Sequence, residues 1–251
     1  APTMLTLDQI GAKSDQANAK LDQLNTKADS INASTEKRIP VDATHTPADA
    51  THQFVISAPG SYYLTGNILA TGDAILISAN NVTLDLNGFS IILSLGSNKT
   101  AVTVTGTHVV VRNGTIRDWG GISGIGLNAS LSNTNTFERL SITGCGTGLE
   151  CGQYCHVQNC FVDSSGSSGI SAGNKSVVED CVANNNPGGN ISVGQYSVVR
   201  HCIATNSSGS GIFAQDGSVV QDCIGSANGN SGISGTGVLI ANCRADGNGT
   251  Y

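Results

Sequence analysis

Apolar residues recur with a period of about 21 positions through the second half of the chain. The hexapeptides VQNCFV, VEDCVA, VRHCIA, VQDCIG and IANCRA align with one another, and Gly, Asn and Ser fill much of the sequence between them. The cysteines of these segments are Cys160, Cys181, Cys202, Cys223 and Cys243. A second apolar column consists of Leu149, Ile170, Ile191, Ile212 and Ile233. Such columns predict a solenoid, in which the strands of successive turns stack ~4.8 Å apart.

Earlier segments extend this pattern toward the N-terminus. The stretches VTLDLNGFSI, VVVRNGTI and FERLSI place Gly88, Gly114 and Leu140 in the cysteine column. One turn of this length cannot bury its apolar side alone, so the turns must share a continuous core. A leucine-rich repeat has a similar period, but the sequence has no LxxLxL pattern and no helix-forming stretch between the strands. We therefore expect an all-β solenoid, a parallel β-helix of about eight turns over residues 54–251.

The first 38 residues carry a different pattern, in which apolar or small residues are spaced alternately three and four positions apart. This seam consists of Leu7, Ile10, Ser14, Ala17, Leu21, Leu24, Ala28 and Ile31. Strict spacing of this kind is typical of a coiled-coil α-helix. Because Pro40 cannot continue a helix, the predicted heptad helix covers residues 1–38 and a linker covers residues 39–53.

The seam is weak for a coiled coil because its serine and alanines bury little area. Lysines flank it at 13, 20 and 27, but the facing heptad positions hold Gly and Asn, so no ion pair can select a partner. The alternatives are a marginal dimer, a trimer, docking along the β-helix of the same or a neighbouring chain, and a solvated linker helix. We interpret the segment as one that mediates self-association.

Composition and charge narrow the set of partners. The net charge is -6 and no run of Lys and Arg is present, which argues against nucleic acid as a partner. The longest apolar stretches fall far short of the ~20 residues that a membrane span requires. Aromatic residues make up only 4% of the chain, which suits a thin stack filled by Val, Ile, Ala and Cys.

The start of the sequence indicates a secreted protein. It begins Ala1-Pro2-Thr3, with neither an initiator Met nor an apolar leader, as a mature chain does after signal-peptide removal. In an extracellular setting, Asn-x-Ser/Thr sequons permit N-glycosylation. They begin at Asn32, Asn81, Asn98, Asn113, Asn128, Asn174, Asn190, Asn206 and Asn248.

Several motifs resemble one known group of proteins. The stretches PGSYYLTGNI (59–68), VTLDLNGFSI (82–91) and VRNGTIRDWGG (111–121), followed by the V-x-D-C-x-A segments, are similar to those of secreted bacterial right-handed parallel β-helix repeat proteins. These proteins belong to the pectate-lyase-like superfamily. The resemblance covers residues 40–251 and implies a right-handed β-helix in an extracellular setting; a heptad segment ahead of the β-helix is also familiar in such proteins. It implies no particular activity.

The eight cysteines suggest two different roles. Those of the column would lie ~4.8 Å apart, where they form either a ladder of buried thiols or a partly oxidised one. The other three, Cys145, Cys151 and Cys155, fall in Gly-rich turns and are disulfide candidates. A zinc site at Cys151, Cys155 and His156 is a third option, but no second pair of ligands completes it. We expect no metal and no cofactor.

Enzyme chemistry has little support in the sequence. The paired aspartates and Gly-His-Gly element of polygalacturonases and the Arg-x-Pro-x-x-Arg element of pectate lyases are absent. Polar residues do precede the cysteine column: Arg139, Asn159, Asp180, His201, Asp222 and Asn242. A neighbouring column holds Glu138, Gln158, Glu179, Arg200 and Gln221, so we expect Glu179 to face Arg200 across one turn. We interpret these columns as a solvated face with cross-strand pairs; a catalytic cluster is the alternative.

The aromatic residues are scattered along the sequence and predict no sugar-binding platform, and Trp119 is expected to pack in the core. These observations favour a secreted, non-catalytic structural or cell-surface protein. It would self-assemble, into extracellular filaments, through the heptad helix and the open end of the β-helix. The alternative is a β-helix that binds or cleaves a polysaccharide, by lyase or hydrolase chemistry.

Overall fold

The computed structural model describes residues 16, 18–24, 26–27, 38–95, 98–121 and 123–249. The chain divides into two units, Ala1–Lys37 and Arg38–Tyr251. The described residues of the first unit form a short helix on which Leu21 and Leu24 are exposed. This short helix gives no support to the predicted coiled coil. The other seam positions, Leu7, Ile10, Ser14, Ala17, Ala28 and Ile31, and the sequon at Asn32 lie outside the described residues.

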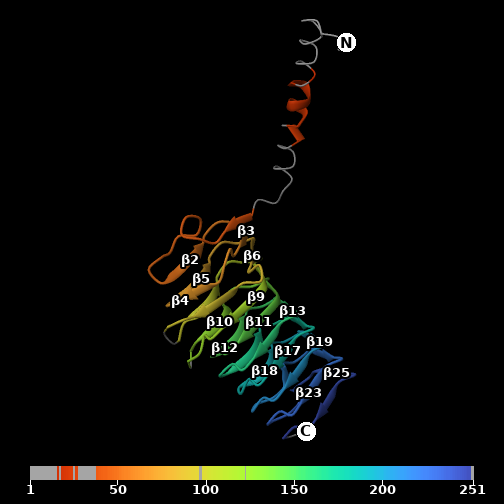
Figure 1. Cartoon of the computed structure of the whole chain (residues 1–251). Helices are drawn as coiled ribbons and strands as arrows, with labels where there is room; N and C mark the ends of the chain where they lie inside the picture. Colours follow the sequence, from red (N-terminus) through yellow and green to blue (C-terminus); the bar gives the residue numbers. More distant parts are fainter. Residues whose placement is uncertain are drawn as a thin grey trace, which may run out of the picture. The chain divides into compact units, whose positions relative to one another are not determined.

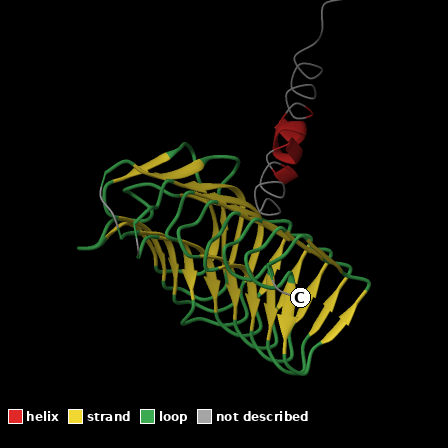
Figure 2. Ribbon diagram, turned by 90° about the horizontal axis from the view of Figure 1, so that it is seen from below, coloured by secondary structure: helices red, strands yellow, loops and turns green. Residues whose placement is uncertain are grey.

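The second unit is a parallel β-solenoid of about ten turns (Figure 1). Each turn contributes strands to three columns, and the strands of successive turns lie side by side (Figure 2). Column 1 contains β1 (Arg38–Pro40), β3 (Gly60–Tyr63), β6 (Val82–Asp85), β9 (Val110–Arg117), β11 (Thr136–Thr143), β13 (His156–Gln158), β16 (Val177–Glu179), β19 (Val198–Arg200), β22 (Val219–Gln221) and β25 (Leu239–Ala241).

Column 2 shares the long strands β9 and β11 with column 1. Its other strands are β4 (Ile68–Ala70), β7 (Ser90–Leu93), β14 (Phe161–Asp163), β17 (Val182–Asn184), β20 (Ile203–Thr205), β23 (Ile224–Ser226) and β26 (Arg244–Asp246). Column 3 is a separate sheet of β2 (His52–Ile56), β5 (Asp73–Ile77), β8 (Thr100–Val104), β10 (Ile125–Ala129), β12 (Thr147–Cys151), β15 (Ser168–Ala172), β18 (Gly189–Val193), β21 (Ile212–Ala214) and β24 (Ile233–Gly235).

The register confirms the periodicity of the sequence. Ile170 pairs with Leu149 before it and with Ile191 after it, one turn apart in each case. The number of turns differs from the expected eight, because β1 and β3 precede the first recognised repeat. They pair with each other, Ile39 opposite Tyr62, and neither carries the apolar pattern that ends in the cysteine column. Strand β1 begins at the last residue of the predicted helix segment and continues into the predicted linker, so the first turn begins at Arg38.

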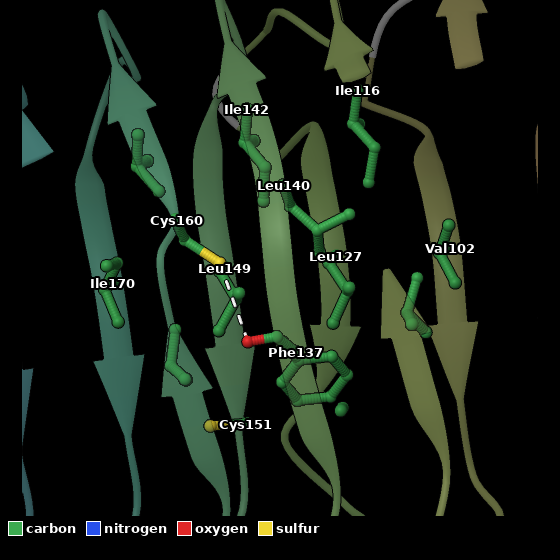
Figure 3. Packing of buried hydrophobic residues seen from close by; sticks show 14 of the residues in the cluster. Val102, Ile116, Leu127, Phe137, Leu140, Ile142, Leu149, Cys151, Cys160 and Ile170 are labelled. Atoms are coloured by element: carbon green, nitrogen blue, oxygen red, sulfur yellow. Dashed lines mark hydrogen bonds between the residues drawn. The ribbon is translucent and has the colours of Figure 1, made fainter. Parts of the chain in front are cut away.

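The core is a thin column of mostly aliphatic side chains. Inward residues such as Ile116, Leu140 and Ile142 are fully or almost fully buried and pack against those of neighbouring turns (Figure 3). Phe137 and Trp119 are the largest fully buried side chains of the described residues, and the Trp119 Nε1–H donates to the Ile91 carbonyl at 3.2 Å. The prediction that Trp119 packs in the core is confirmed. Each fully buried aliphatic side chain contributes roughly 1.5–3 kcal/mol.

Each turn has three corners, and from β9 onward a residue in the left-handed conformation stands at each of them. We name the corners by the residues that recur there. At the cysteine corner, between columns 1 and 2, these residues are Asn113, Arg139, Asn159, Asp180, His201, Asp222 and Asn242. At the asparagine corner, between columns 2 and 3, they are Asp118, Gly144, Ser164, Asn185, Asn206, Ala227 and Gly247. At the serine corner, between columns 3 and 1, they are Asn81, His108, Thr134, Tyr154, Lys175, Tyr196, Gly217 and Gly237.

At many corners the side chain after the left-handed residue is buried or half-buried and ties one turn to the next. At the serine corner the Ser197 Oγ accepts the Ser176 N–H at 3.1 Å. At the asparagine corner the Asn228 Oδ1 accepts the Ser207 N–H at 3.0 Å. At the cysteine corner the Cys223 Sγ lies 3.4 Å from the Cys202 nitrogen. These ladders satisfy buried N–H groups at the corners, which would otherwise be costly.

Candidate functional site

The outward face of column 1 carries a ladder of polar side chains in register. We call it the charged ladder, and it consists of Asp85, Arg112, Glu138, Gln158, Glu179, Arg200 and Gln221. Opposite charges alternate along most of it, and each described carboxylate has a cationic neighbour. Asp85 lies 3.3 Å from both Arg38 and Arg112, and Glu138 contacts Arg139.

Glu179 is the most strongly held carboxylate in the middle of the ladder. The Arg200 Nε donates to its Oε2 at 2.5 Å, and the His156 Nε2 lies 2.6 Å from its Oε1. Burial raises the pKa of this carboxyl, but the hydrogen bonds from Arg200 and His156 outweigh burial and hold the pKa below its ordinary value. The prediction that Glu179 faces Arg200 is confirmed.

A tyrosine strip borders the charged ladder along the serine corner. It consists of Tyr154, Lys175, Tyr196 and Gly217, one residue from each of four successive turns. Tyr154 is 50% exposed and Tyr196 is 60% exposed. The Lys175 Nζ donates to the Tyr154 hydroxyl at 3.2 Å and lies 5.3 Å from its ring centre. The expectation of scattered aromatic residues is therefore wrong for these two tyrosines.

Half-buried valines fill the space between the tyrosine strip and the charged ladder. They are the first residues of three successive strands: Val177, Val198 and Val219. The outward face of β13, β16, β19 and β22 therefore presents His156 and the three valines, with the tyrosine strip on one border and the charged ladder on the other. We call this surface the column 1 face. Tyr154 and Tyr196 are 42 residues apart, which is two periods of the repeat, and each ends a Gly-Gln-Tyr segment, so the periodicity of the sequence carries the signal for this strip.

The alternative catalytic cluster divides between two places. Glu179 and Arg200 belong to the charged ladder, whereas Asp180, His201 and Asp222 stand at the cysteine corner with positive φ. His201 lies 3.4 Å from Asp180 and 3.8 Å from Asp222. Asn and Asp tolerate the left-handed conformation better than most residues, so the backbone explains much of this polar column. Among the described residues, no group of three or more side chains is suited to hold a metal ion.

The cysteines follow the two predicted roles in part. Cys151 and Cys155 form a disulfide, whereas Cys145 is a free buried thiol at the asparagine corner. The five column cysteines are free, and Cys160, for example, donates from its Sγ to the Phe137 carbonyl at 3.6 Å (Figure 3). The structure thus has the ladder of reduced thiols and not the partly oxidised one.

One sequon is incompatible with the folded protein. Asn190 is fully buried, and its Nδ2 donates to the Thr205 carbonyl at 2.7 Å, so a glycan cannot be attached without unfolding this corner. Three described sequon asparagines are exposed: Asn81, Asn98 and Asn206. The half-buried ones are Asn113, Asn128, Asn174 and Asn248. Glycosylation at these seven positions stays a prediction.

A hollow of about 660 Å³ lies at the asparagine corner. It is lined by Gly120, Gly121, Gly144, Cys145, Gly146, Ser164, Gly166 and Ser167. Its one titratable lining group is the Cys145 thiol, whose pKa burial raises to about 12. A thiol that stays protonated is a poor nucleophile, so the hollow offers little chemistry. Within the described residues, no helix is long and apolar enough to cross a membrane.

Comparisons with known proteins support the fold. A family model described as a right-handed β-helix region matches residues 148–251, in agreement with the expected handedness. The A-module of the mannuronan C-5 epimerase AlgE6 of Azotobacter vinelandii is similar in structure, with 15% identity and a TM-score of 0.50, over 76% of this chain and 69% of that one. The AlgE4 A-module of the same organism has 13% identity and a TM-score of 0.48, over 74% and 68%. A comparison with curated proteins finds no significant match.

Proposed function

We propose that this chain binds an extended polysaccharide along the column 1 face, without transforming it. The observation that carries the proposal is the alignment of Tyr154 and Tyr196 in one exposed strip, two turns apart. Two turns correspond to ~9.6 Å along the stack. A stack of turns and an extended sugar chain are both linear repeats, so a polymer parallel to the stack would meet the same kinds of side chain again and again.

The chemistry of the column 1 face suits sugar rings. A tyrosine offers an apolar ring face to the C–H side of a sugar and a hydroxyl group to its polar edge. The valines between the two borders exclude water, and the side chains of the charged ladder offer hydrogen-bond donors and acceptors. Ligand sites usually combine an apolar surface with a few polar groups of this kind.

Binding fits the charged ladder better than cleavage does. A glycosidase needs a carboxylic acid that keeps its proton, usually because its pKa is raised. Glu179 has the opposite property, since Arg200 and His156 hold it ionised. Asp85 is likewise held below its ordinary pKa: burial raises the pKa, but the bonds from Asn87 and Asn113 and the charge of Arg112 outweigh burial.

Two further facts support a polysaccharide in an extracellular setting. The fold is shared with a module whose name says that it acts on mannuronan, so polysaccharides are the first ligand class to test. The Cys151–Cys155 disulfide suits an oxidising compartment, where disulfides persist. A secreted protein held at a surface by such binding would match both features.

The test is affinity electrophoresis of the full chain through gels that contain a panel of neutral and acidic polysaccharides. We expect retardation by at least one of them, and loss of that retardation in the Tyr154→Ala/Tyr196→Ala variant. Phe213→Ala is the matched control, because Phe213 is also exposed but lies on column 3. Equal retardation of the double variant and the wild type would overturn the assignment to the column 1 face. Release of reducing ends or unsaturated products would overturn the proposal that the chain does not transform its ligand.

A further inference from the structure

Column 2 exposes an apolar stripe that the proposed sugar-binding face does not include. We call it the column 2 stripe, and it consists of Phe161, Val182, Ile203 and Ile224, which pair in register over four successive turns. Phe161 is 42% exposed and Ile203 is 38% exposed. Val182 and Ile224 are half-buried. An apolar line that continues over four turns on the outside of the β-helix indicates a contact surface.

The two borders of the column 2 stripe differ in charge. On the side of the cysteine corner stand Asp180 and Asp222, two turns apart, with His201 between them. On the other side stand Asp163, Asn184, Thr205 and Ser226, of which only Asp163 is charged. A partner that fits this surface needs an apolar line, with cations along one side of it and neutral or acidic groups along the other.

The short helix of the first unit has this arrangement of side chains. Leu21 and Leu24 are exposed. Successive residues of an α-helix are rotated by ~100°, so Lys20 and Asp22 lie on opposite sides of Leu21. Lys27 follows Lys20 by one heptad and lies on the same side. The helix therefore offers an apolar line with lysines along one side only.

The spacings of the helix and the stripe also agree. Leu21 and Leu24 are separated by ~4.5 Å along the helix axis, and neighbouring residues of the column 2 stripe by ~4.8 Å. Lys20 and Lys27 are separated by ~10.5 Å, and Asp180 and Asp222 by ~9.6 Å. An α-helix parallel to the stack can thus place one apolar residue on each turn and one lysine near each aspartate.

We propose that a second copy of this chain docks its N-terminal helix on the column 2 stripe. Leu21 and Leu24 pack on Ile203 and its neighbours in the stripe, and Lys20 and Lys27 pair with Asp180 and Asp222. The contact is heterologous, since one copy supplies the helix and the other supplies the stripe. Repetition of such a contact produces rings or open chains of molecules. Self-association then uses a surface different from the column 1 face, so a polysaccharide can be bound at the same time.

Sedimentation velocity of the full chain over a range of concentrations tests this proposal. We expect the weight-average mass to rise with concentration and to fall at high salt, because exposed ion pairs are screened. Ile203→Asp and, separately, Lys20→Glu/Lys27→Glu should weaken association about tenfold or more. Leu131→Asp is the control, because Leu131 is 90% exposed on another part of the β-helix. Circular dichroism checks that each variant is folded.

Charge exchange makes the test specific to the proposed pairs. Asp180→Lys/Asp222→Lys introduces cations at two left-handed corner positions, and Lys175 shows that a lysine is tolerated in that conformation. Mixed with Lys20→Glu/Lys27→Glu, this variant should restore the association that is weakened in each variant alone. A monomeric mass of the wild type at every concentration would overturn the proposal. Association of Lys20→Glu/Lys27→Glu as strong as that of the wild type would also overturn it.

Discussion

The ring of Tyr196 lies against the backbone of Gly217 in the next turn of the β-helix. A Cβ added at Gly217 would stand 2.5 Å from Cδ1 of that ring and 2.6 Å from Cε1. The missing side chain therefore lets the tyrosine lie along the surface while the ring stays 60% exposed. Gly217 also has a φ of 72°, a conformation that other residues enter at a cost.

Gly217→Ala should tilt the Tyr196 ring and weaken polysaccharide binding. It should also lower the free energy of unfolding by about 1 kcal/mol, because alanine is strained in the left-handed conformation. Gly247→Ala separates the two effects, since Gly247 has a similar φ and an added Cβ would lie 3.8 Å from the nearest atom, the Ala227 nitrogen. Affinity electrophoresis and urea denaturation of both variants check this. Equal binding by the two variants would contradict the role given to the Tyr196 ring.

The ion pair between Glu179 and Arg200 should make a small contribution to stability. Both partners lie on a sheet surface and Arg200 is half-exposed, so we expect a coupling energy of about 0.2–1 kcal/mol. A double-mutant cycle with Glu179→Gln and Arg200→Gln, measured by urea denaturation, gives this quantity. Val198 and Val219, on neighbouring strands of the same face, offer sites for control substitutions that leave the pair intact. A coupling energy of zero would show that solvent screens the pair completely.

Stability should fall in acid because Glu179 and Asp85 have lowered pKa values in the folded protein. A carboxyl with a lowered folded pKa binds its proton more readily in the unfolded state. Its contribution to stability is therefore complete above the ordinary pKa and is lost as the pH falls through the folded pKa. We expect the urea midpoint to decrease as the pH falls below about 5, and to decrease less in Glu179→Gln. An unchanged pH profile in that variant would exclude Glu179 as a contributor.

Cys223 should be replaced by serine at a lower cost than by alanine. Its sulfur lies 3.4 Å from the Cys202 nitrogen, and alanine leaves that buried N–H without its partner, at a cost of about 1–3 kcal/mol. A serine oxygen can accept the same N–H, as Ser218 does from Ser197 at the serine corner. Urea denaturation of Cys223→Ala and Cys223→Ser compares the two. Equal stability of both variants would argue that the sulfur acts only through its volume.

Thiol reactivity should distinguish one cysteine from the rest. Six cysteines are free, and of these only Cys243 is not fully buried. Burial raises the pKa of the Cys145 thiol to about 12. The pKa of the Cys202 thiol is also raised to about 12, first by the hydrogen bond between Cys202 and Cys181 and then by burial. In the native protein, a thiol reagent at mildly alkaline pH should label Cys243 first and the others slowly. In urea all six should react, and rapid labelling of Cys202 in the native state would contradict the ladder.

The periodicity of the sequence predicts the stack and much of its register, because like residues must lie above like ones in a solenoid. It recovers the pairing of Glu179 with Arg200 for the same reason. It does not recover the first two turns. Strand β1 contains Pro40, and β3 begins with Gly60 and contains two tyrosines, so neither strand resembles the later repeats in composition.

The corners explain what the pattern could not show. Asp180, His201 and Asp222 resemble a polar column of a sheet face, but all three have positive φ and belong to a bend of the backbone. Tyr154 and Tyr196 occupy the equivalent position of another corner, where Lys175 and Gly217 also stand. Both tyrosines end a Gly-Gln-Tyr segment and are two repeat periods apart, so alignment of the repeats groups them, whereas Lys175 and Gly217 join the strip through backbone conformation alone.

The fixed stacking of the turns gives equivalent side chains a constant spacing along the β-helix. Every side chain in a strip is separated from the next by one turn, and the corner ladders hold each turn against the one after it. The separation of Tyr154 and Tyr196 can therefore change only in whole turns, through gain or loss of a complete repeat. The length of ligand that the strip contacts would change in the same whole-turn steps. A substitution at one corner instead alters the side chain that contacts the ligand and leaves the spacing between turns unchanged.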